Sequence, residues 1–218
     1  MVLQSIIYSL AAYVLGSIPF GKLISARVAR IDITRRGSGN VGATNVAREL
    51  GLKWGLLTLV LDMMKGFVPV SLFAAAASTG GTLYAICLSA VGLSALIGHQ
   101  FSIFMGFRGG KGVATALGVF LALSPLSCLI GLLIFVVVVA IWDFISLGSM
   151  VSAISLAVLM GVLGKPFPIV LGGFAAAALI CVKHHENIGR LLKGEERKWR
   201  ERSSQPRTSS NLSNSSSE

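Results

Sequence analysis

Apolar residues in this chain are gathered into long continuous blocks rather than alternating with polar ones. Six such blocks are separated by polar or glycine-rich segments, at residues 3–24, 54–77, 82–99, 112–141, 147–163 and 167–182. A helix needs about 20 apolar residues to cross the hydrocarbon core of a bilayer, so five of the blocks each predict one crossing. The pattern therefore predicts an all-α, polytopic integral membrane protein.

The block 112–141 is long enough for either one kinked helix or two short helices that meet at Pro125. The distribution of lysine and arginine favours two helices. Seven of these 19 residues lie between residues 22 and 53, two lie at 108 and 111, and eight lie after residue 182. A break at Pro125 gives seven transmembrane helices, an external N-terminus and a cytoplasmic C-terminus. All three basic clusters then lie on the cytoplasmic side, where such residues concentrate.

The composition agrees with a membrane protein, because 54% of the residues are hydrophobic and 13% are charged, against roughly a quarter charged in a soluble domain. Cytoplasmic loops explain the net charge of +10, so we expect no nucleic acid partner.

The first block lacks the basic start of a signal peptide and predicts a retained span. We expect residues 1–202 to form one membrane-embedded domain and the serine-rich residues 203–218 to form a disordered tail.

The cysteines give no sign of a metal site or a disulfide framework. Cys87, Cys128 and Cys181 lie inside apolar blocks, without a partner cysteine or histidine at a ligand spacing. This placement is typical of small buried side chains. We therefore expect no metal, and no motif in the chain predicts a cofactor.

The segment RRGSGNVGATNVAR, at 35–48, is unusually polar for its position between two apolar blocks. Glycines allow a backbone to turn its N–H groups toward one point, and such nests bind anions. The candidate groups are Gly37, Ser38, Gly39, Asn40, Gly42, Thr44 and Asn45. Arg48 adds a planar donor fork that matches phosphate oxygens. Contact with anionic lipid headgroups would explain Arg35 and Arg36 but not the interleaved glycines, so we favour a phosphate site.

A second glycine-rich segment, GFRGGKGVAT at 106–115, leads into the fourth block. Its phosphate-binding candidates are Gly109, Gly110, Lys111 and Gly112. Backbone N–H groups at a helix start, together with a lysine, suit a phosphate. The segment is not a Walker motif, because Gly112 stands where a serine or threonine is required and Met105 where the first glycine is required. We therefore expect no nucleotide, and a glycine hinge with a snorkelling lysine stays open as the alternative.

We predict structural roles for two polar features within the apolar blocks, the pair Asp62 and Lys65 and the residue His99. Asp62 and Lys65 are three residues apart, so they can form an ion pair on one helical face, as buried membrane charges usually do. His99 stands at the end of its block and does not begin an H-x-x-x-x-D acyltransferase motif, because the required aspartate position holds Phe104. We expect a structural hydrogen bond from this histidine.

The last apolar block continues into KHHENIGRLLKGEERK. On a continuing helix His184 and Asn187 share one face, with Arg190 close behind. A basic amphipathic helix on the membrane surface would explain the lysines and arginines. It would not explain why a histidine and an asparagine emerge together from the bilayer, so we treat both as candidate site residues.

Four segments together resemble the bacterial acyl-phosphate-dependent glycerol-3-phosphate acyltransferases, the PlsY family. They are GSIPFG at 16–21, GSGNVGATNVAR at 37–48, GHQFSIFMGFRGGKGVAT at 98–115 and HHENIGRLLKGEE at 184–196. The resemblance covers nearly the whole chain apart from the serine-rich tail. It departs from the family pattern at Lys183, where an arginine is usual, and at His185 and Glu195, which replace another basic residue and a threonine.

The resemblance implies transfer of a fatty acyl group from acyl phosphate to the 1-hydroxyl of glycerol 3-phosphate. The products would be lysophosphatidic acid and phosphate, in the first acylation step of phospholipid synthesis, on the cytoplasmic side of the bacterial inner membrane. The positions it marks as catalytic are Ser38, Arg48, Lys111, His184 and Asn187. We expect the substrates and their phosphates to be held by Gly37, Gly39, Asn40, Thr44, Asn45, Gly109, Gly110, Gly112, Arg190 and Glu196.

Two questions have alternative answers at this point. His184 either takes the proton from the glycerol hydroxyl or only orients the substrate while oxygens of the acyl phosphate take it, and we favour the second. A transporter of phosphate or organophosphate anions is the alternative function, and it would place polar groups near the bilayer midplane. The sequence leaves the oligomeric state open, and a monomer is one option.

Overall fold

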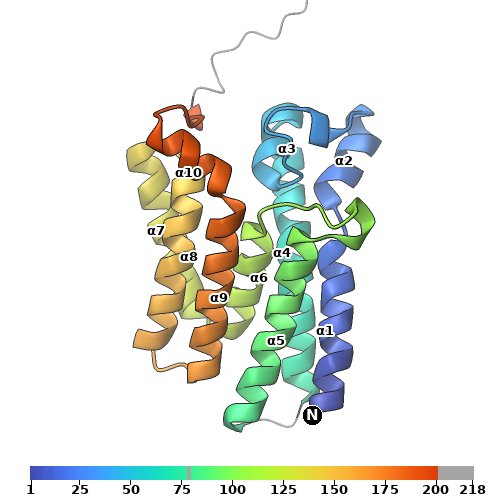
Figure 1. The fold of residues 1–218 in the computed structure, drawn as a ribbon, viewed down its shortest axis with the longest axis vertical. Coiled ribbons are helices and arrows are strands. Elements are labelled where there is room, and N and C mark those ends of the chain that lie inside the picture. The colour runs from blue at the N-terminus through green and yellow to red at the C-terminus, as the bar shows by residue number, and fades with distance from the viewer. Residues whose placement is uncertain (78–79, 201–218) are drawn as a thin grey trace, which may run out of the picture.

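The computed structural model describes residues 1–77 and 80–200, and within these ranges the regular secondary structure is helical (Figure 1). The α-helices are α1 (Val2–Ser17), α2 (Phe20–Ala29), α3 (Ala43–Leu50), α4 (Leu52–Ala76), α5 (Gly81–Gln100), α6 (Val113–Leu123), α7 (Pro125–Trp142), α8 (Ile145–Val162), α9 (Phe167–Lys183) and α10 (His185–Leu192). Two short 3₁₀ helices, η1 (Ile33–Arg35) and η2 (Ile103–Met105), lie in the loops after α2 and α5. The tail expected at 203–218 lies outside the described residues.

The helices follow the predicted apolar blocks closely, except within the first one. A continuous span is expected over residues 3–24, but α1 ends at Ser17 and α2 begins at Phe20. Pro19 lies between them, and a proline interrupts a helix because it has no N–H to donate. The first block is therefore a broken helix rather than a single straight one.

The break expected at Pro125 is present, and it separates a short helix from a long one. Pro125 occupies the first turn of α7, where the missing N–H costs nothing. The preceding α6 has only 11 residues, so it rises about 16 Å at 1.5 Å per residue, about half of a hydrocarbon core. By length and composition the described helices provide five membrane spans, or six when the bent pair α9 and α10 counts as one.

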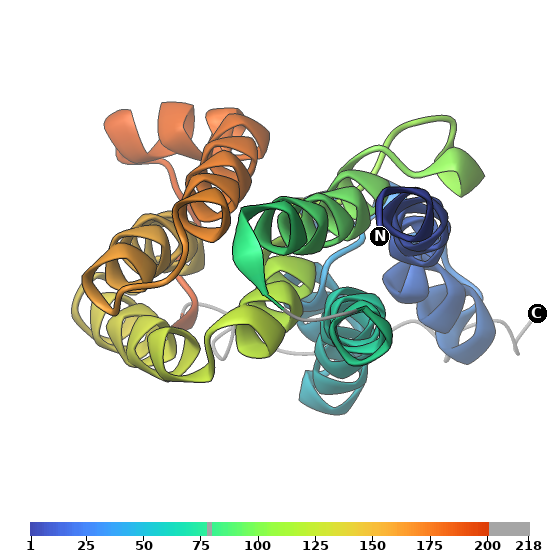
Figure 2. The same cartoon turned by 90° about the horizontal axis from the view of Figure 1, so that it is seen from below.

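The long helices stand side by side in two groups, with α6 between them (Figures 1 and 2). Helices α1, α4 and α5 pack on one side, α7, α8 and α9 pack on the other, and α6 contacts α4 and α7. The short helices α2, α3 and α10 gather at one end of the bundle, together with the loop between α5 and α6 (Figure 1). The N-terminus lies at the opposite end, so the polar motifs of the sequence are brought to one end of an apolar bundle.

Small residues hold α6 tightly against α4. A Cβ at Gly66 of α4 would collide with the backbone of Thr115, and a Cβ at Gly118 of α6 would collide with the backbone of Met63. Such close approach of backbones is typical of helix pairs in membranes, where van der Waals contact drives association. The contact fixes the position of the N-terminus of α6.

Candidate active site

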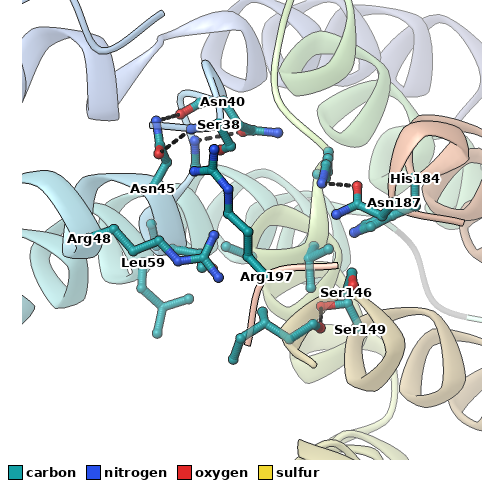
Figure 3. Close-up of a pocket in the computed structure, with 18 of the residues that line it drawn as sticks. Ser38, Asn40, Asn45, Arg48, Leu59, Ser146, Ser149, His184, Asn187 and Arg197 are labelled. Carbon is teal, nitrogen blue, oxygen red and sulfur yellow. Dashed lines mark hydrogen bonds between the residues drawn. The ribbon is translucent and has the colours of Figure 1, made fainter. Parts of the chain in front are cut away.

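A polar cavity of about 380 Å³ lies at the end of the bundle where the short helices gather (Figure 3). Much of its wall comes from four segments that are far apart in the sequence: α3 with the loop before it, the loop before α6, the start of α8, and α10 with the residues after it. Side chains of α4, α5 and α7 complete the wall. Most residues predicted for the site line this cavity, namely Gly37, Ser38, Asn40, Thr44, Asn45, Arg48, Lys111, Gly112, His184, Asn187, Arg190 and Glu196. The fold therefore brings the separate motifs together.

Asn45 organises the first glycine-rich loop from inside. Its side chain is buried, and its Oδ1 accepts a hydrogen bond from the N–H of Ser38 at 3.0 Å. Its Nδ2 donates to the carbonyls of Arg36 and Asn40 at 3.0 and 2.9 Å. Because these bonds use its amide, Asn45 lines the cavity chiefly as the residue that shapes the loop.

Two helices begin at the cavity. The first turn of α3 lines it through Ala43 and Thr44, and the first turn of α6 lines it through Val113 and Ala114. A helix N-terminus presents backbone N–H groups and a partial positive charge, which together attract phosphate. The sequence indicated this arrangement only for the second loop, whereas the structure has it at both.

Three predicted glycines do not line the cavity: Gly39, Gly109 and Gly110. The N–H of Gly39 donates to the carbonyl of Arg36 at 2.8 Å, and the N–H of Gly110 donates to the carbonyl of His99 at 3.1 Å. Both groups are therefore occupied within the protein. A Cβ at Gly109 or Gly110 would collide with His99. In this structure these three glycines turn and pack the loops, and their expected phosphate contacts stay a prediction.

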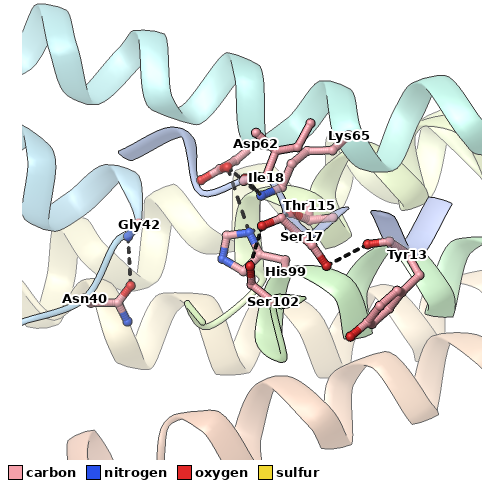
Figure 4. Close-up of polar contacts among 10 residues, drawn as sticks. All are labelled: Tyr13, Ser17, Ile18, Asn40, Gly42, Asp62, Lys65, His99, Ser102 and Thr115. Atoms are coloured by element: carbon pink, nitrogen blue, oxygen red, sulfur yellow. Dashed lines mark hydrogen bonds and ion pairs between the residues drawn. The ribbon is translucent and has the colours of Figure 1, made fainter. Parts of the chain in front are cut away.

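A buried polar cluster borders the cavity through Asp62 and His99 and joins α1, α4, α5 and α6 (Figure 4). Lys65 lies 2.9 Å from the carboxylate of Asp62 and donates to the carbonyl of Ile18 at 2.8 Å, in the break between α1 and α2. His99 Nδ1 lies 3.2 Å from the hydroxyl of Thr115. The ion pair and the histidine hydrogen bond that the sequence predicts are both present. The cluster supports the loop that carries Lys111 through the contact of His99 with the glycines before it.

A chain of hydrogen bonds joins Lys111 to the last helix. Its Nζ donates to Oδ1 of Asn187, and Nδ2 of Asn187 donates to Glu196 at 2.6 Å. The carboxylate of Glu196 also accepts from Oγ of Ser146 at 2.6 Å and from Nε of Arg190 at 2.8 Å. Burial raises the pKa of Glu196, but these hydrogen bonds outweigh it, and the pKa lies below its ordinary value. A charged Glu196 therefore ties α8 to α10.

Burial sets the charge states of Lys111 and His184. It lowers the pKa of Lys111 to about 8, although the charge of Glu196 opposes the shift. Burial and the charge of Lys111 lower the pKa of His184 to about 4, so this ring is neutral at pH 7. His184 Nδ1 lies 2.8 Å from the carbonyl of Ile180. A carbonyl can only accept, so Nδ1 carries the proton and Nε2 is a hydrogen-bond acceptor.

A second chamber of about 260 Å³ adjoins the polar cavity, and its wall is apolar. The residues that line both are Ala43, Thr44, Leu59, Val113, Ala114, Phe135, Ile145 and Ser149. The rest of the wall includes Phe120, Gly131 and Leu156, on α6, α7 and α8. A polar cavity joined to an apolar one suits a molecule with an anionic head and a hydrocarbon chain.

Some residues of the site were not predicted from the sequence. Ser146 and Ser149 of α8 line the polar cavity, as does Arg197 after α10. Serines in an apolar helix are common as small packing residues, and Arg197 lies among many basic residues, so neither stands out by type. The three-residue spacing of the serines at the start of α8 was the one signal in the sequence.

The apolar bundle, with a polar cavity beside an apolar one at its end, is typical of a membrane protein that acts on amphipathic molecules. Residues 6–194 match the family described as glycerol-3-phosphate acyltransferase. The chain is 46% identical over 190 residues to the glycerol-3-phosphate acyltransferase of Trichlorobacter lovleyi, covering 87% of this chain and 94% of that one. It is 45% identical over 199 residues to that of Geobacter sulfurreducens, covering 91% and 99%. The chain belongs to the glycerol-3-phosphate acyltransferase family.

Two solved structures have the same fold. One is the crystal structure of PlsY (YgiH), an integral membrane glycerol 3-phosphate acyltransferase, in its glycerol 3-phosphate form. It is 39% identical, with a TM-score of 0.83, and the match covers 89% of this chain and 95% of that chain. The lysophosphatidic acid form of PlsY gives a TM-score of 0.81, with coverage of 89% and 94%. The present chain is thus an integral membrane protein and an acyltransferase.

Proposed function

We propose that this enzyme transfers a fatty acyl group from acyl phosphate to the 1-hydroxyl of glycerol 3-phosphate, giving lysophosphatidic acid and inorganic phosphate. The observation that carries the proposal is that a polar cavity, which suits phosphates, shares part of its wall with an apolar chamber, which suits a fatty acyl chain. Two helix N-termini at the cavity match two substrates that each carry a phosphate. The alternative of an anion transporter fits less well, because the cavity residues gather at one end of the bundle.

Arg48 and Lys111 bind and neutralise the substrate phosphates in this proposal. Arg48, on α3, lies across the cavity from Asn187 (Figure 3), and Lys111, before α6, donates to Asn187. Charge-assisted hydrogen bonds to phosphate are roughly twice as strong as neutral ones. Ser38, whose N–H is held by Asn45, lines the same cavity and offers its hydroxyl as a further donor.

The reaction itself requires no covalent acyl-enzyme, because acyl phosphate is already activated. The 1-hydroxyl oxygen of glycerol 3-phosphate attacks the acyl carbonyl carbon, and a new ester C–O bond forms. The C–O bond to phosphate breaks, and phosphate leaves with the electron pair. Cationic and N–H groups placed around the departing phosphate and the carbonyl oxygen stabilise the negative charge that develops there.

The hydroxyl proton passes to an oxygen of the acyl phosphate, while His184 and Asn187 orient the glycerol. A general base works best when its pKa lies near the working pH, and the pKa of His184 is about 4. Its Nε2 can still accept a hydrogen bond from a substrate hydroxyl. Kinetics of His184→Ala across pH provide the test. A modest fall with a higher KM is expected, and total loss at every pH would assign the proton to His184 instead.

The activity is tested with purified protein, palmitoyl phosphate and labelled glycerol 3-phosphate. Formation of labelled lysophosphatidic acid is expected, with little or none when palmitoyl-CoA replaces the phosphate donor. Failure to form lysophosphatidic acid from palmitoyl phosphate would overturn the proposed reaction. Activity with palmitoyl-CoA but not with palmitoyl phosphate would identify acyl-CoA as the acyl donor.

We further propose seven membrane passes, with the site on the cytoplasmic side of a bacterial inner membrane and residues 1–202 as one domain. The N-terminus and the described C-terminal residues lie at opposite ends of the bundle (Figure 1), which supports an odd number of passes that includes the short α6. In a cysteine-free background, Lys165→Cys should react with an impermeant maleimide on intact spheroplasts. Lys193→Cys should react only after the membrane is permeabilised, and the reverse pattern would invert the orientation.

A further inference from the structure

The chain does not leave the site after α10. Helix α10 ends at Leu192, and Gly194 reverses the chain direction at a φ of 71°. The N–H of Glu195 then donates to the carbonyl of Arg190 at 2.8 Å. We call residues 195–200 the C-terminal strap. This turn sends the strap back along the polar cavity instead of into solvent.

The strap is fixed on both sides of Arg197. On one side, Glu196 is bound to α8 and α10 by the hydrogen bonds described above. On the other side, the N–H of Trp199 donates to the carbonyl of Asp143 at 2.9 Å, and the N–H of Arg200 lies 3.2 Å from the carboxylate of Asp143. The backbone that carries Arg197 is therefore held between α10 and the end of α7.

Arg197 faces the substrate cavity. It lines the cavity with Arg48, and its guanidinium points toward the loop that carries Ser38 (Figure 3). In the part of the chain that the structure describes, no carboxylate pairs with Arg197. Trp199, two residues further on, lines the apolar chamber. The strap thus places Arg197 on the polar cavity and Trp199 on the neighbouring apolar chamber.

The net charge of the side chains that line the cavity indicates a role for Arg197 in binding phosphate. Four cationic and two anionic side chains line the cavity: Arg48, Lys111, Arg190, Arg197, Asp62 and Glu196. Both histidines that line it are buried, and loss of Arg197 would reduce the formal net charge of these side chains from +2 to +1. Each substrate phosphate brings about −1.5 to −2 at pH 7. The negative charge of two such phosphates exceeds the net positive charge of the cavity, so each cationic side chain contributes to their binding.

We propose that Arg197 binds the phosphate group of the acyl donor, and that the strap holds it in place for this contact. The inference rests on the proposed function, because it assigns a ligand within the same site. The donor is chosen over glycerol 3-phosphate because Arg197 lies on the Arg48 side of the cavity and is joined through the strap to the apolar chamber. Lys111 and Asn187 stand on the other wall.

The test is steady-state kinetics of the full-length protein, with palmitoyl phosphate and glycerol 3-phosphate varied in turn. Arg197→Ala should raise the KM for palmitoyl phosphate about 10-fold or more, as expected for loss of a hydrogen bond to a charged group. Its kcat and its KM for glycerol 3-phosphate should stay within about 2-fold. Arg197→Lys should recover part of the loss, because it retains the charge but not the planar fork.

Lys193→Ala is the matched control, because Lys193 is an exposed cation at the end of α10 that does not line the cavity. It should leave both KM values unchanged. An unchanged KM for palmitoyl phosphate in Arg197→Ala, or an equal rise for both substrates, would overturn the assignment. Inactive wild-type protein would instead overturn the proposed function, so the two failures are distinguishable.

The anchoring role of the strap has its own test. Asp143→Asn weakens the contact with Arg200 while it keeps the left-handed backbone of residue 143, at a φ of 63°, accessible to the new side chain. We expect a smaller rise in the KM for palmitoyl phosphate, and no further rise when it is combined with Arg197→Ala. A fully additive effect would show that the strap does not act through Arg197.

Discussion

Lys65 and Lys111 are both withdrawn from solvent, yet their surroundings give them different tasks. Lys65 is 5% exposed and meets a carboxylate, that of Asp62, at 2.9 Å. Lys111 donates directly to a neutral amide oxygen, that of Asn187, and its wall of the cavity is open to a ligand. A buried lysine matched by a carboxylate stabilises the fold, whereas one that meets an amide keeps positive charge for an anion. Burial alone does not distinguish a structural lysine from a functional one.

The largest effect should come from removing Lys65. In Lys65→Met the charge of Asp62 is left buried without its cation, which costs about 3–5 kcal/mol of folding free energy. This corresponds to a fall in unfolding temperature of roughly 10 °C for a chain of this size, measured by thermal unfolding in detergent. Adding Asp62→Asn should recover most of the loss. An unfolding temperature of Lys65→Met equal to that of the wild type would show that Lys65 has no structural role, and the contrast with Lys111 would fail.

Lys111→Met should affect activity instead of stability. Removing a group that stabilises developing charge costs about 10²–10³ in rate, so kcat/KM should fall by about that factor. The unfolding temperature should stay equal or rise, because the folded protein no longer buries an ammonium group. A fall in unfolding temperature as large as that of Lys65→Met would assign Lys111 a structural role.

Exchanging the partner of Lys111 tests the comparison directly. Asn187→Asp gives Lys111 a carboxylate like that of Lys65, and Glu196→Gln in the same protein removes the neighbouring charge that would repel it. We expect the KM for glycerol 3-phosphate to rise about 10-fold, since the added anion competes with the substrate phosphate for the lysine charge. Glu196→Gln alone is the control. An equal rise of this KM in the control would assign the effect to the loss of Glu196 and not to the exchange at Asn187.

The smallest effect near neutral pH is a pH dependence. Burial lowers the pKa of Lys111 to about 8, so its positive charge is present below this pH and is lost as the pH rises through it. We expect kcat/KM to fall above pH 8, by about tenfold per pH unit once most of the Lys111 side chain has lost its proton. Lys111→Arg should lack this alkaline limb, because arginine stays protonated. A flat wild-type profile between pH 7 and 10 would contradict the proposed role.

Much of the fold and part of the site follow from local sequence rules. The apolar blocks predicted α4, α5, α8 and α9 to within a few residues, and Pro125 predicted the break before α7. The grouping of Ser38, Lys111 and Asn187 in one cavity also followed from the side on which their loops were placed. These features depend on hydrophobicity, proline geometry and charge, each of which a short segment reveals.

Other features depend on contacts that a short segment does not reveal. The N–H groups of Gly39 and Gly110 were expected to face a phosphate, but carbonyls of Arg36 and His99 hold them. The apolar chamber arises from residues on several helices whose side chains are individually ordinary. Arg197 becomes distinctive only after Gly194 turns the chain back toward the cavity. Tertiary packing decided each of these cases.

The shortness of α6 has a consequence for where the ester is made. Helices α6 and α7 meet at Ser124, and with 11 and 18 residues they rise about 16 and 27 Å from that point. The N-terminus of α6 therefore lies about 10 Å deeper than the end of α7. In the proposed orientation, we expect the ester to form below the cytoplasmic surface of the membrane, at a depth from which the new lipid can join the leaflet without being lifted into water.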